Sequence, residues 1–432
     1  MGYAPGGLEM YRWMSDLFPI CRSITGDGNR QTLEYLQKLN PDLQLHEAPT
    51  GESVFDWKVP REWKIREAFI EHVASGKRFA NFAENNLHVW SYSAPVDRVI
   101  TKDELLEHVR TQPDRPDAIP YVTTYYQENW GFSLSENTRQ SLPDGDYRVA
   151  IDSELFSGAL VYADYLLQGT EQKEVFFSTY FCHPSMANNE LSGPVVSTAL
   201  QLFLRNRFPT PRYSYRFVLV PETIGSLTYL SRHLQDLKEN VVAGFQLTCL
   251  GDERKYTQIQ SRAGATLADK ALAASLQECT PVDLFPFAFR DSDERQYCWP
   301  GIDLPVTTFC RSKPGTYPEY HTSDDNLELV SPLGLAQSLG VLVRIVESFE
   351  LGLYPSVATI GEPQLGKRSL YPAIGQKVAE GEPRFPTRVN LDLLVSCDGE
   401  TSLFDLSSQL DLPLSEVIEE VRRLRKLDLL LP

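Results

Sequence analysis

The apolar residues of this chain follow two different spacings, which predict two kinds of element. Near the start, Leu8, Trp13 and Leu17 recur at helical intervals, and a similar series begins at Leu33. This pattern predicts two helices joined by a polar turn. Residues 53–141 instead contain short aromatic segments separated by prolines, which are typical of a small β-rich domain.

Beyond residue 142, apolar runs of strand length alternate with stretches of helix length. We expect strands at 147–151, 159–162, 175–181, 215–220 and 241–249, and helices at 195–205, 226–237 and 332–353. This alternation is typical of a mostly parallel sheet with helices on both faces. The sequence therefore predicts an α/β fold.

The last part of the chain has a third texture. A stretch rich in proline and glycine, 354–386, predicts a surface linker. Three short helices are expected after it, at 391–395, 402–410 and 415–427, which together suggest a winged-helix module. The expected domains are an α/β domain formed by 1–52 and 142–385, an inserted β-rich domain at 53–141, and a winged-helix domain at 386–432.

Charge argues against a nucleic-acid partner. The 432 residues include 58 acidic and 41 basic side chains, so the formal net charge is −17 and the surface repels polyanions. Residues 386–432 hold nine acidic and five basic side chains. For the winged-helix module we therefore expect a protein partner or self-association rather than DNA binding.

Apolar runs and cysteines bear on location. No run approaches the roughly 20 apolar residues of a membrane-spanning helix, and Met1–Leu17 lacks the pattern of a secretion signal. The seven cysteines are scattered and form no CxxC pair, which is typical of reduced thiols. We expect a cytoplasmic protein with no membrane partner.

Candidate chemistry lies directly after the predicted strands. His183 and Asn189 follow one strand, and Glu222 follows the next. His321 lies in a later polar loop that also holds Asp324 and Asp325. Because the carboxyl ends of parallel strands meet at one edge of a sheet, we expect these loops to converge.

The residue types in these loops suit a metal site. Histidine is a common zinc ligand, and a carboxylate on its other ring nitrogen fixes the tautomer, a role expected here for Asp324 or Asp325. Glu222 could bind metal or act as a base. The competing interpretations are hydrogen-bonded structural histidines and a glutamate stabilised by a helix dipole.

Several long runs resemble a bacterial family of aminopeptidase-like proteins. They are Arg22–Gly26, Phe55–Trp63, Cys182–Gly193, Tyr320–Asp325 and Glu362–Arg368. The resemblance covers nearly the whole chain. It implies the fold shared by zinc aminopeptidases and glutaminyl cyclase, with a small inserted domain and a C-terminal winged helix.

The resemblance implies roles for some residues and questions others. His183 and His321 match the two histidine ligands of the di-zinc aminopeptidases, and Glu222 matches the general base. Four neutral residues stand where acidic ones are usual: Ser185, Asn189, Thr223 and Thr248. Two zinc ions need anionic ligands between them, so we expect at most one zinc, held by His183 and His321 with Asn189 or Glu222.

Further residues are candidates for the base and for substrate binding. If Glu222 binds the metal, Asp293 is the substitute base, because its segment resembles one that lines the aminopeptidase pocket. Arg295 and Arg311 could each pair with a substrate carboxylate, or form surface ion pairs. The resemblance also marks Tyr320 as a substrate-binding residue.

These observations favour a zinc-dependent hydrolase of an amide or peptide bond, acting on a small or peptide-like substrate with a free amino end. Two alternatives remain open. The fold could serve as a binding or scaffold protein whose active site has decayed, as the neutral replacements suggest. It could also catalyse amide transfer or cyclisation, as glutaminyl cyclase does.

Overall fold

An eight-stranded sheet forms the centre of the protein in this computed structural model, which describes residues 5–368, 370 and 386–432. Its strands, in spatial order, are β1 (Gln44–Pro49), β10 (Ala159–Leu167), β12 (Ser214–Val220), β11 (Glu174–Tyr180), β13 (Val241–Leu247), β16 (Val306–Cys310), β14 (Tyr256–Ile259) and β15 (Val282–Phe285). Four of the seven neighbouring pairs run parallel. The expected mostly parallel sheet is confirmed.

The central strands are buried on both faces. Every residue of β11 and β12 is buried, which explains their nearly continuous apolar sequences. In the ladder, Tyr180 pairs with Val220, and Thr179 pairs with Leu247. The carboxyl ends of β11, β12 and β13 are therefore level, and the segments that follow them start side by side.

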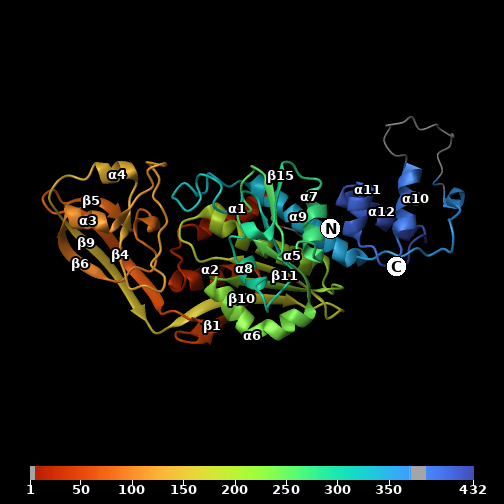
Figure 1. Ribbon diagram of the computed structural model, residues 1–432, viewed down its shortest axis with the longest axis horizontal. Coiled ribbons are helices and arrows are strands. Elements are labelled where there is room, and N and C mark those ends of the chain that lie inside the picture. The colour runs from red at the N-terminus through yellow and green to blue at the C-terminus, as the bar shows by residue number, and fades with distance from the viewer. Residues whose placement is uncertain (1–4, 369, 371–385) are drawn as a thin grey trace.

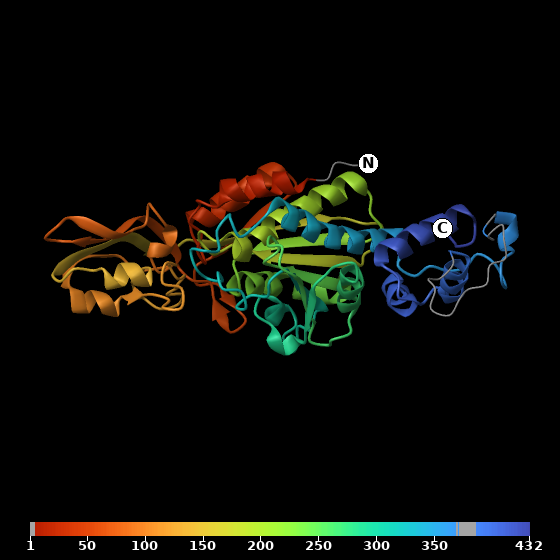
Figure 2. The same cartoon turned by 90° about the horizontal axis from the view of Figure 1, so that it is seen from above.

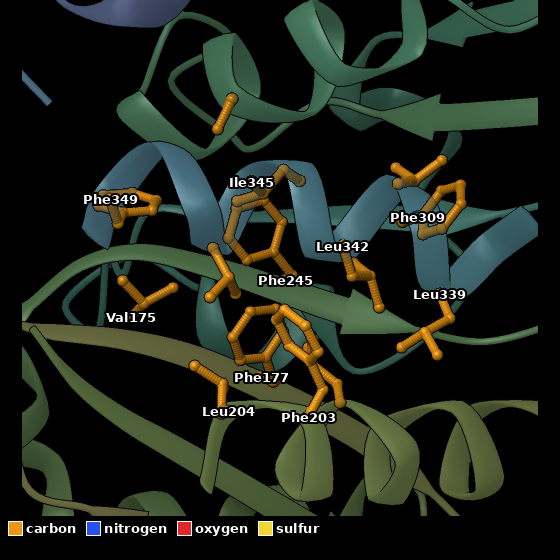
Figure 3. Close-up of a cluster of buried hydrophobic side chains, with 14 of the residues drawn as sticks. Val175, Phe177, Phe203, Leu204, Phe245, Phe309, Leu339, Leu342, Ile345 and Phe349 are labelled. Carbon is orange, nitrogen blue, oxygen red and sulfur yellow. The ribbon is translucent and has the colours of Figure 1, made fainter. Parts of the chain in front are cut away.

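Helices cover both faces of the sheet. One face packs against α1 (Gly7–Leu17), α2 (Asp27–Leu39), α5 (Ser192–Arg207), α7 (Leu267–Leu276) and α9 (Pro332–Gly352). The other packs against α6 (Ile224–Asn240) and α8 (Glu294–Tyr297). Figure 3 shows Phe177 and Phe245 of the sheet between Phe203 of α5 and Ile345 of α9.

The inserted lobe has its own four-stranded sheet. In spatial order the strands are β5 (Lys77–Asn81), β4 (Glu62–His72), β9 (Asp146–Phe156) and β6 (Val96–Thr101), with α3 (Lys102–Glu107) and α4 (Glu136–Gln140) beside them. The strand expected at 147–151 lies in this sheet, because β9 pairs with β4 from Phe156 to Tyr147. The lobe therefore extends past residue 141, to the end of β9.

After residue 385 the structure describes three helices, as expected. They are α10 (Pro386–Ser396), α11 (Leu403–Leu410) and α12 (Leu414–Lys426). Leu403 and Val417 belong to the same apolar core as α7 and α9, and the rings of Phe349 and Phe404 meet edge to face at 5.6 Å. Much of the predicted linker, 369 and 371–385, lies outside the described residues.

The three parts lie in a row, with the inserted lobe and the C-terminal helices at opposite ends (Figures 1 and 2). Within the described segments, no helix is both long enough and apolar enough to span a membrane.

Candidate metal and catalytic site

Strained backbone marks the carboxyl edge of the central sheet. Ser185, Thr223 and Cys249 follow β11, β12 and β13, with φ angles of 48°, 65° and 50°, and His321 in the loop beyond β16 has a φ of 56°. Such left-handed conformations are costly for residues other than glycine, by about 1–3 kcal/mol each. Strain of this kind is common at functional sites. The four strained residues therefore indicate a functional site at this edge of the sheet.

His183 is buried and held from two sides. Its Nδ1 lies 2.6 Å from Oε2 of Glu190, and its carbonyl accepts a hydrogen bond from Arg22 Nε at 3.1 Å. Burial lowers the pKa of His183 to about 3, with a further contribution from the Arg22 charge. Burial also raises the pKa of Glu190 to about 8. The histidine is therefore neutral, and its Nε2 points away from Glu190.

Glu190 was not predicted as a functional residue. It lies in η2 (Ala187–Leu191), a single π-helical turn that leads into α5. The only signal in the sequence was the polar run around Asn189, and the resemblance directed attention to that asparagine instead. A π-turn shifts the side-chain register, which sequence spacing does not reveal.

The imidazole of His321 lies beside that of His183, with 5.3 Å between the ring centres. Tyr320 stacks on His321 at 3.9 Å, and Tyr121 of the inserted lobe meets both histidine rings, at 5.0 Å and 5.2 Å. The Tyr121 N–H also donates to the His321 carbonyl at 2.8 Å. The fold therefore brings the two predicted histidines together beside Tyr121, which was not predicted to belong to the site.

Glu222 completes the group. Its Oε2 lies 3.8 Å from His183 Nε2, and its backbone N–H donates to the Cys182 sulfur at 3.2 Å. Burial raises the pKa of Glu222 to about 8, and the neighbouring Asp293 carboxylate adds to the shift. His183, His321 and Glu222, predicted from three separate loops, thus lie within one site.

Asp293 and Arg295 support the segment after Glu222. The Asp293 Oδ1 accepts hydrogen bonds from the Thr223 N–H and the Ser226 hydroxyl, both at 2.8 Å. Burial raises the pKa of Asp293 to about 6. Arg295 Nη2 donates to the Thr223 hydroxyl at 2.7 Å.

Asn189 is buried in a network of neutral groups. Its Nδ2 donates to the Tyr180 hydroxyl at 2.9 Å, and that hydroxyl lies 2.5 Å from the Thr248 hydroxyl. Its Oδ1 has no hydrogen-bond partner. The neutral side chains of Asn189 and Thr248 are therefore joined through Tyr180.

The expectation for Asp324 and Asp325 is corrected. Asp325 accepts three backbone hydrogen bonds from residues 187–189, at 2.6–3.1 Å, and one from the Tyr317 hydroxyl. Asp324 pairs with Arg115 of the inserted lobe. Glu190, rather than Asp324 or Asp325, contacts Nδ1 of His183. Asp325 is not available for this contact because its hydrogen bonds hold η2.

Arg311 lies outside the site cavity. Its Nε donates to the Lys255 carbonyl at 2.7 Å, its Nη1 donates to Gln337, and its guanidinium lies over the Tyr256 ring at 3.9 Å. These contacts occupy the side chain as a structural group.

A cavity of about 290 Å³ opens onto His183 and Glu222. It is lined by Ile24, Trp57, Tyr125, Tyr126, Cys182, His183, Glu222, Thr223, Ile224 and Arg295. Its walls come from the central domain and from the inserted segment, so both parts shape the space beside the histidines.

This fold is that of an aminopeptidase-like protein. A solved zinc aminopeptidase from Bacillus subtilis superposes with a TM-score of 0.58 at 12% identity, covering 80% of this chain and 95% of that chain. The chain belongs to the family described as a domain of unknown function, DUF4910, which matches residues 11–351, and residues 353–432 match a winged helix-turn-helix family. The C-terminal match begins well before residue 386, where the sequence analysis placed the boundary.

Two matches of higher identity come from Clostridium acetobutylicum. One, provisionally named a polysaccharide biosynthesis protein with an aminopeptidase-like domain, is 42% identical over 93% of this chain and 91% of its own length. The other is a crystal structure of a provisionally named peptidase, with a TM-score of 0.88 at 38% identity, covering 98% of this chain and 96% of that one. The expected aminopeptidase-like family is confirmed.

Proposed function

We propose that this protein is a zinc-dependent hydrolase of an amide or peptide bond next to a free amino group, with one metal ion per chain and Glu222 as general base. The observation that carries the proposal is the position of Glu222 Oε2, 3.8 Å from His183 Nε2, at an open cavity. The fold of the Bacillus subtilis zinc aminopeptidase and the names of the two clostridial matches support the peptidase class.

The side chains present fit one metal ion. Glu190 occupies Nδ1 of His183 and leaves Nε2 on the side of Glu222 and His321. Asn189 adds a buried Oδ1 that has no partner. Zinc accepts imidazole nitrogens and oxygen atoms as ligands. The ring nitrogen of a ligand histidine that does not bind the metal often contacts a carboxylate.

A second metal ion does not fit. Thr223 and Thr248 offer hydroxyls where the di-zinc enzymes have carboxylates, and the Thr223 hydroxyl already accepts from the Arg295 guanidinium. A permanent positive charge there opposes a second cation. One metal ion per chain is therefore the limit that these residues set.

Cys182, His183 and Glu190 also hold ligand atoms within 4.8 Å of one another. We do not assign the metal to this trio. Burial raises the pKa of the Cys182 thiol well above its ordinary value, so the thiolate that would bind metal is disfavoured. The Glu190 oxygen, in turn, already contacts His183 Nδ1.

The proposed chemistry divides the roles among the residues. A bound zinc ion would polarise the scissile carbonyl and lower the pKa of a water molecule. Glu222, in its deprotonated form, accepts the proton of the attacking water and returns it to the leaving amine. Asp293 is a positioning residue that fixes the backbone after Glu222, while Arg295 and Tyr320 contact the substrate.

Metal analysis tests the proposal. We expect close to one zinc per chain in protein purified without a metal-affinity tag, and loss of that zinc in the double variant His183→Ala, His321→Ala. The matched control is His46→Ala, His72→Ala, which removes two histidines outside the site. Turnover of aminoacyl amides, with the products identified, then distinguishes hydrolysis from cyclisation.

The neutral network around Asn189 favours a second candidate function, a binding protein without catalysis. It predicts no zinc after metal is added back and no amide turnover. Either stoichiometric zinc that depends on the two histidines, or turnover that depends on Glu222, would exclude it.

A further inference from the structure

A larger cavity adjoins the candidate site. Its volume is about 610 Å³, within the range of ligand-binding pockets. We call it the aromatic groove; it is lined by Phe55, Asp56, Trp57, Leu227, Leu234, Gln296, Trp299, Pro300, Gly301 and Ile302. Trp57 lines both this groove and the site cavity.

Helices α6 and α8 each contribute lining residues to both cavities. On α6, Ile224 lines the site cavity, and Leu227, one turn later, lines the groove. On α8, Arg295 lines the site cavity, and the next residue, Gln296, lines the groove. The groove therefore lies next to the site cavity, and Trp57 belongs to the walls of both.

The exposed aromatic side chains make the groove unusual. Of the six tryptophans in the chain, Trp57 and Trp299 are the two exposed ones, at 40% and 56%, and both line the groove. Phe55 is 53% exposed at the same place. Large aromatic rings left open to solvent in one patch mark a binding surface.

The charge of the lining limits what can bind. Asp56 is the one ionisable residue of the groove, and Gln296 adds a single amide. With no cation in the lining, a phosphate or carboxylate group has no partner. A sugar would also find few hydrogen-bonding side chains, so the groove suits neutral apolar groups.

The length of the groove sets the size of its occupant. Leu234 lies ten residues after Ile224 on α6, a distance of about 15 Å along the helix axis. An extended peptide advances about 3.3 Å per residue. A peptide that runs along α6 from Ile224 therefore reaches Leu234 with about its fifth residue.

We infer that the aromatic groove binds the continuing chain of a peptide substrate whose amino end lies at Glu222 and whose fourth and fifth residues are large and apolar. This inference rests on the proposed function, which supplies the free amino end. It names a substrate class, peptides of five or more residues, in place of small amides.

The test measures binding in the Glu222→Gln variant, which keeps the cavities and stops turnover. The probes are a pentapeptide amide with two phenylalanines at its carboxyl end and a counterpart amide with two alanines there. Each is titrated by calorimetry. We expect the first to bind at least about tenfold more tightly. Adding Trp299→Ala should remove this preference, whereas Phe289→Ala, an exposed ring outside both cavities, should keep it.

The outcomes separate this inference from the proposed function. Equal binding of the two peptides, or a preference that survives Trp299→Ala, would overturn the inference even if the wild-type protein hydrolyses amides. Tighter binding of a dodecanoyl amide than of either peptide would also overturn it, in favour of a lipid-like occupant. Absence of turnover in the wild-type protein contradicts the hydrolase proposal alone, because the binding preference is measured without catalysis.

Discussion

At the scale of single residues, the site is defined by what contacts each ring nitrogen and each carboxylate. His183 has its two nitrogens on different partners, Glu190 on Nδ1 and Glu222 near Nε2. The ring of His321 lies beside that of His183, as the predicted convergence of the loops requires. The contact of Glu190 with Nδ1 of His183 was not predicted. Contacts between loops depend on side-chain direction, which a single sequence does not specify.

Glu222→Gln tests the general base. The substitution preserves the shape of the side chain but removes the proton acceptor, so we expect kcat/KM to fall by about a thousandfold while zinc content stays unchanged. Initial rates on aminoacyl amides and elemental analysis of the same samples measure both. Glu328→Gln, at an exposed position, is the control. Unchanged turnover would contradict the assignment.

Glu190→Gln tests the support of His183. An amide in place of the carboxyl group weakens the hydrogen bond at Nδ1 of His183. The imidazole then becomes a weaker ligand, and we expect the zinc affinity to fall by about ten- to a hundredfold. Competition with a chromogenic chelator measures the affinity. Glu222→Gln, which alters the other side of the ring, is the comparison and should retain more of it. Equal affinity in wild type and Glu190→Gln would show that Nδ1 does not need the carboxylate.

At the scale of elements, two short segments carry residues of the site, and each is held by contacts from a distant part of the chain. The turn η2 is held by Asp325, which accepts its backbone N–H groups. The loop of His321 is held by the inserted lobe, through the hydrogen bond from Tyr121 and the ion pair of Arg115 with Asp324. Neither contact could be predicted, because each joins segments that lie more than 130 residues apart in the sequence.

Asp325→Asn should destabilise the protein strongly. An amide group in this buried position offers fewer acceptors to three backbone N–H groups and the Tyr317 hydroxyl. We expect the free energy of unfolding to fall by about 3 kcal/mol, measured by urea denaturation. Asp324→Asn is the matched control, since it removes a partly exposed ion pair and should cost less than about 1 kcal/mol. Equal losses in the two variants would contradict this account.

Tyr121→Ala tests the contribution of the inserted lobe to the metal site. Removing a half-buried ring that touches both histidines should lower the free energy of unfolding by about 2 kcal/mol. We also expect it to change the visible absorption of the cobalt-substituted protein, which reports ligand geometry. Tyr121→Phe keeps the ring and should retain the wild-type spectrum. An unaltered spectrum in the alanine variant would show that the lobe does not position the histidines.

At the scale of the whole molecule, the C-terminal helices are part of the central core. The sequence predicted three helices correctly and treated them as a separate module. In the structure, Phe404 packs on Phe349 of α9, and Lys270 of α7 pairs with Asp405 at 2.8 Å. Their shared apolar core indicates that the central domain and these helices unfold together.

Phe404→Ala tests this shared core. All six tryptophans lie before residue 353, so tryptophan fluorescence reports only on the central domain and the inserted lobe. We expect the variant to lower the free energy of unfolding seen by this signal by about 3 kcal/mol. The control is Val395→Ala, at a position that is 84% exposed, which should change it by less than about 0.5 kcal/mol. No shift for Phe404→Ala would mean that the C-terminal module unfolds independently.

The sequence by itself determined the α/β architecture, the three C-terminal helices and the placement of His183, Glu222 and His321 after strands. Periodic burial and strand ends are local properties, so they can be read along the chain. The tertiary structure alone decided that Glu190 orients His183, that Arg311 lies away from the site and that β9 joins the inserted sheet. Those outcomes depend on distant segments packing against one another. The spacing of residues along the chain does not show which distant segment each residue contacts.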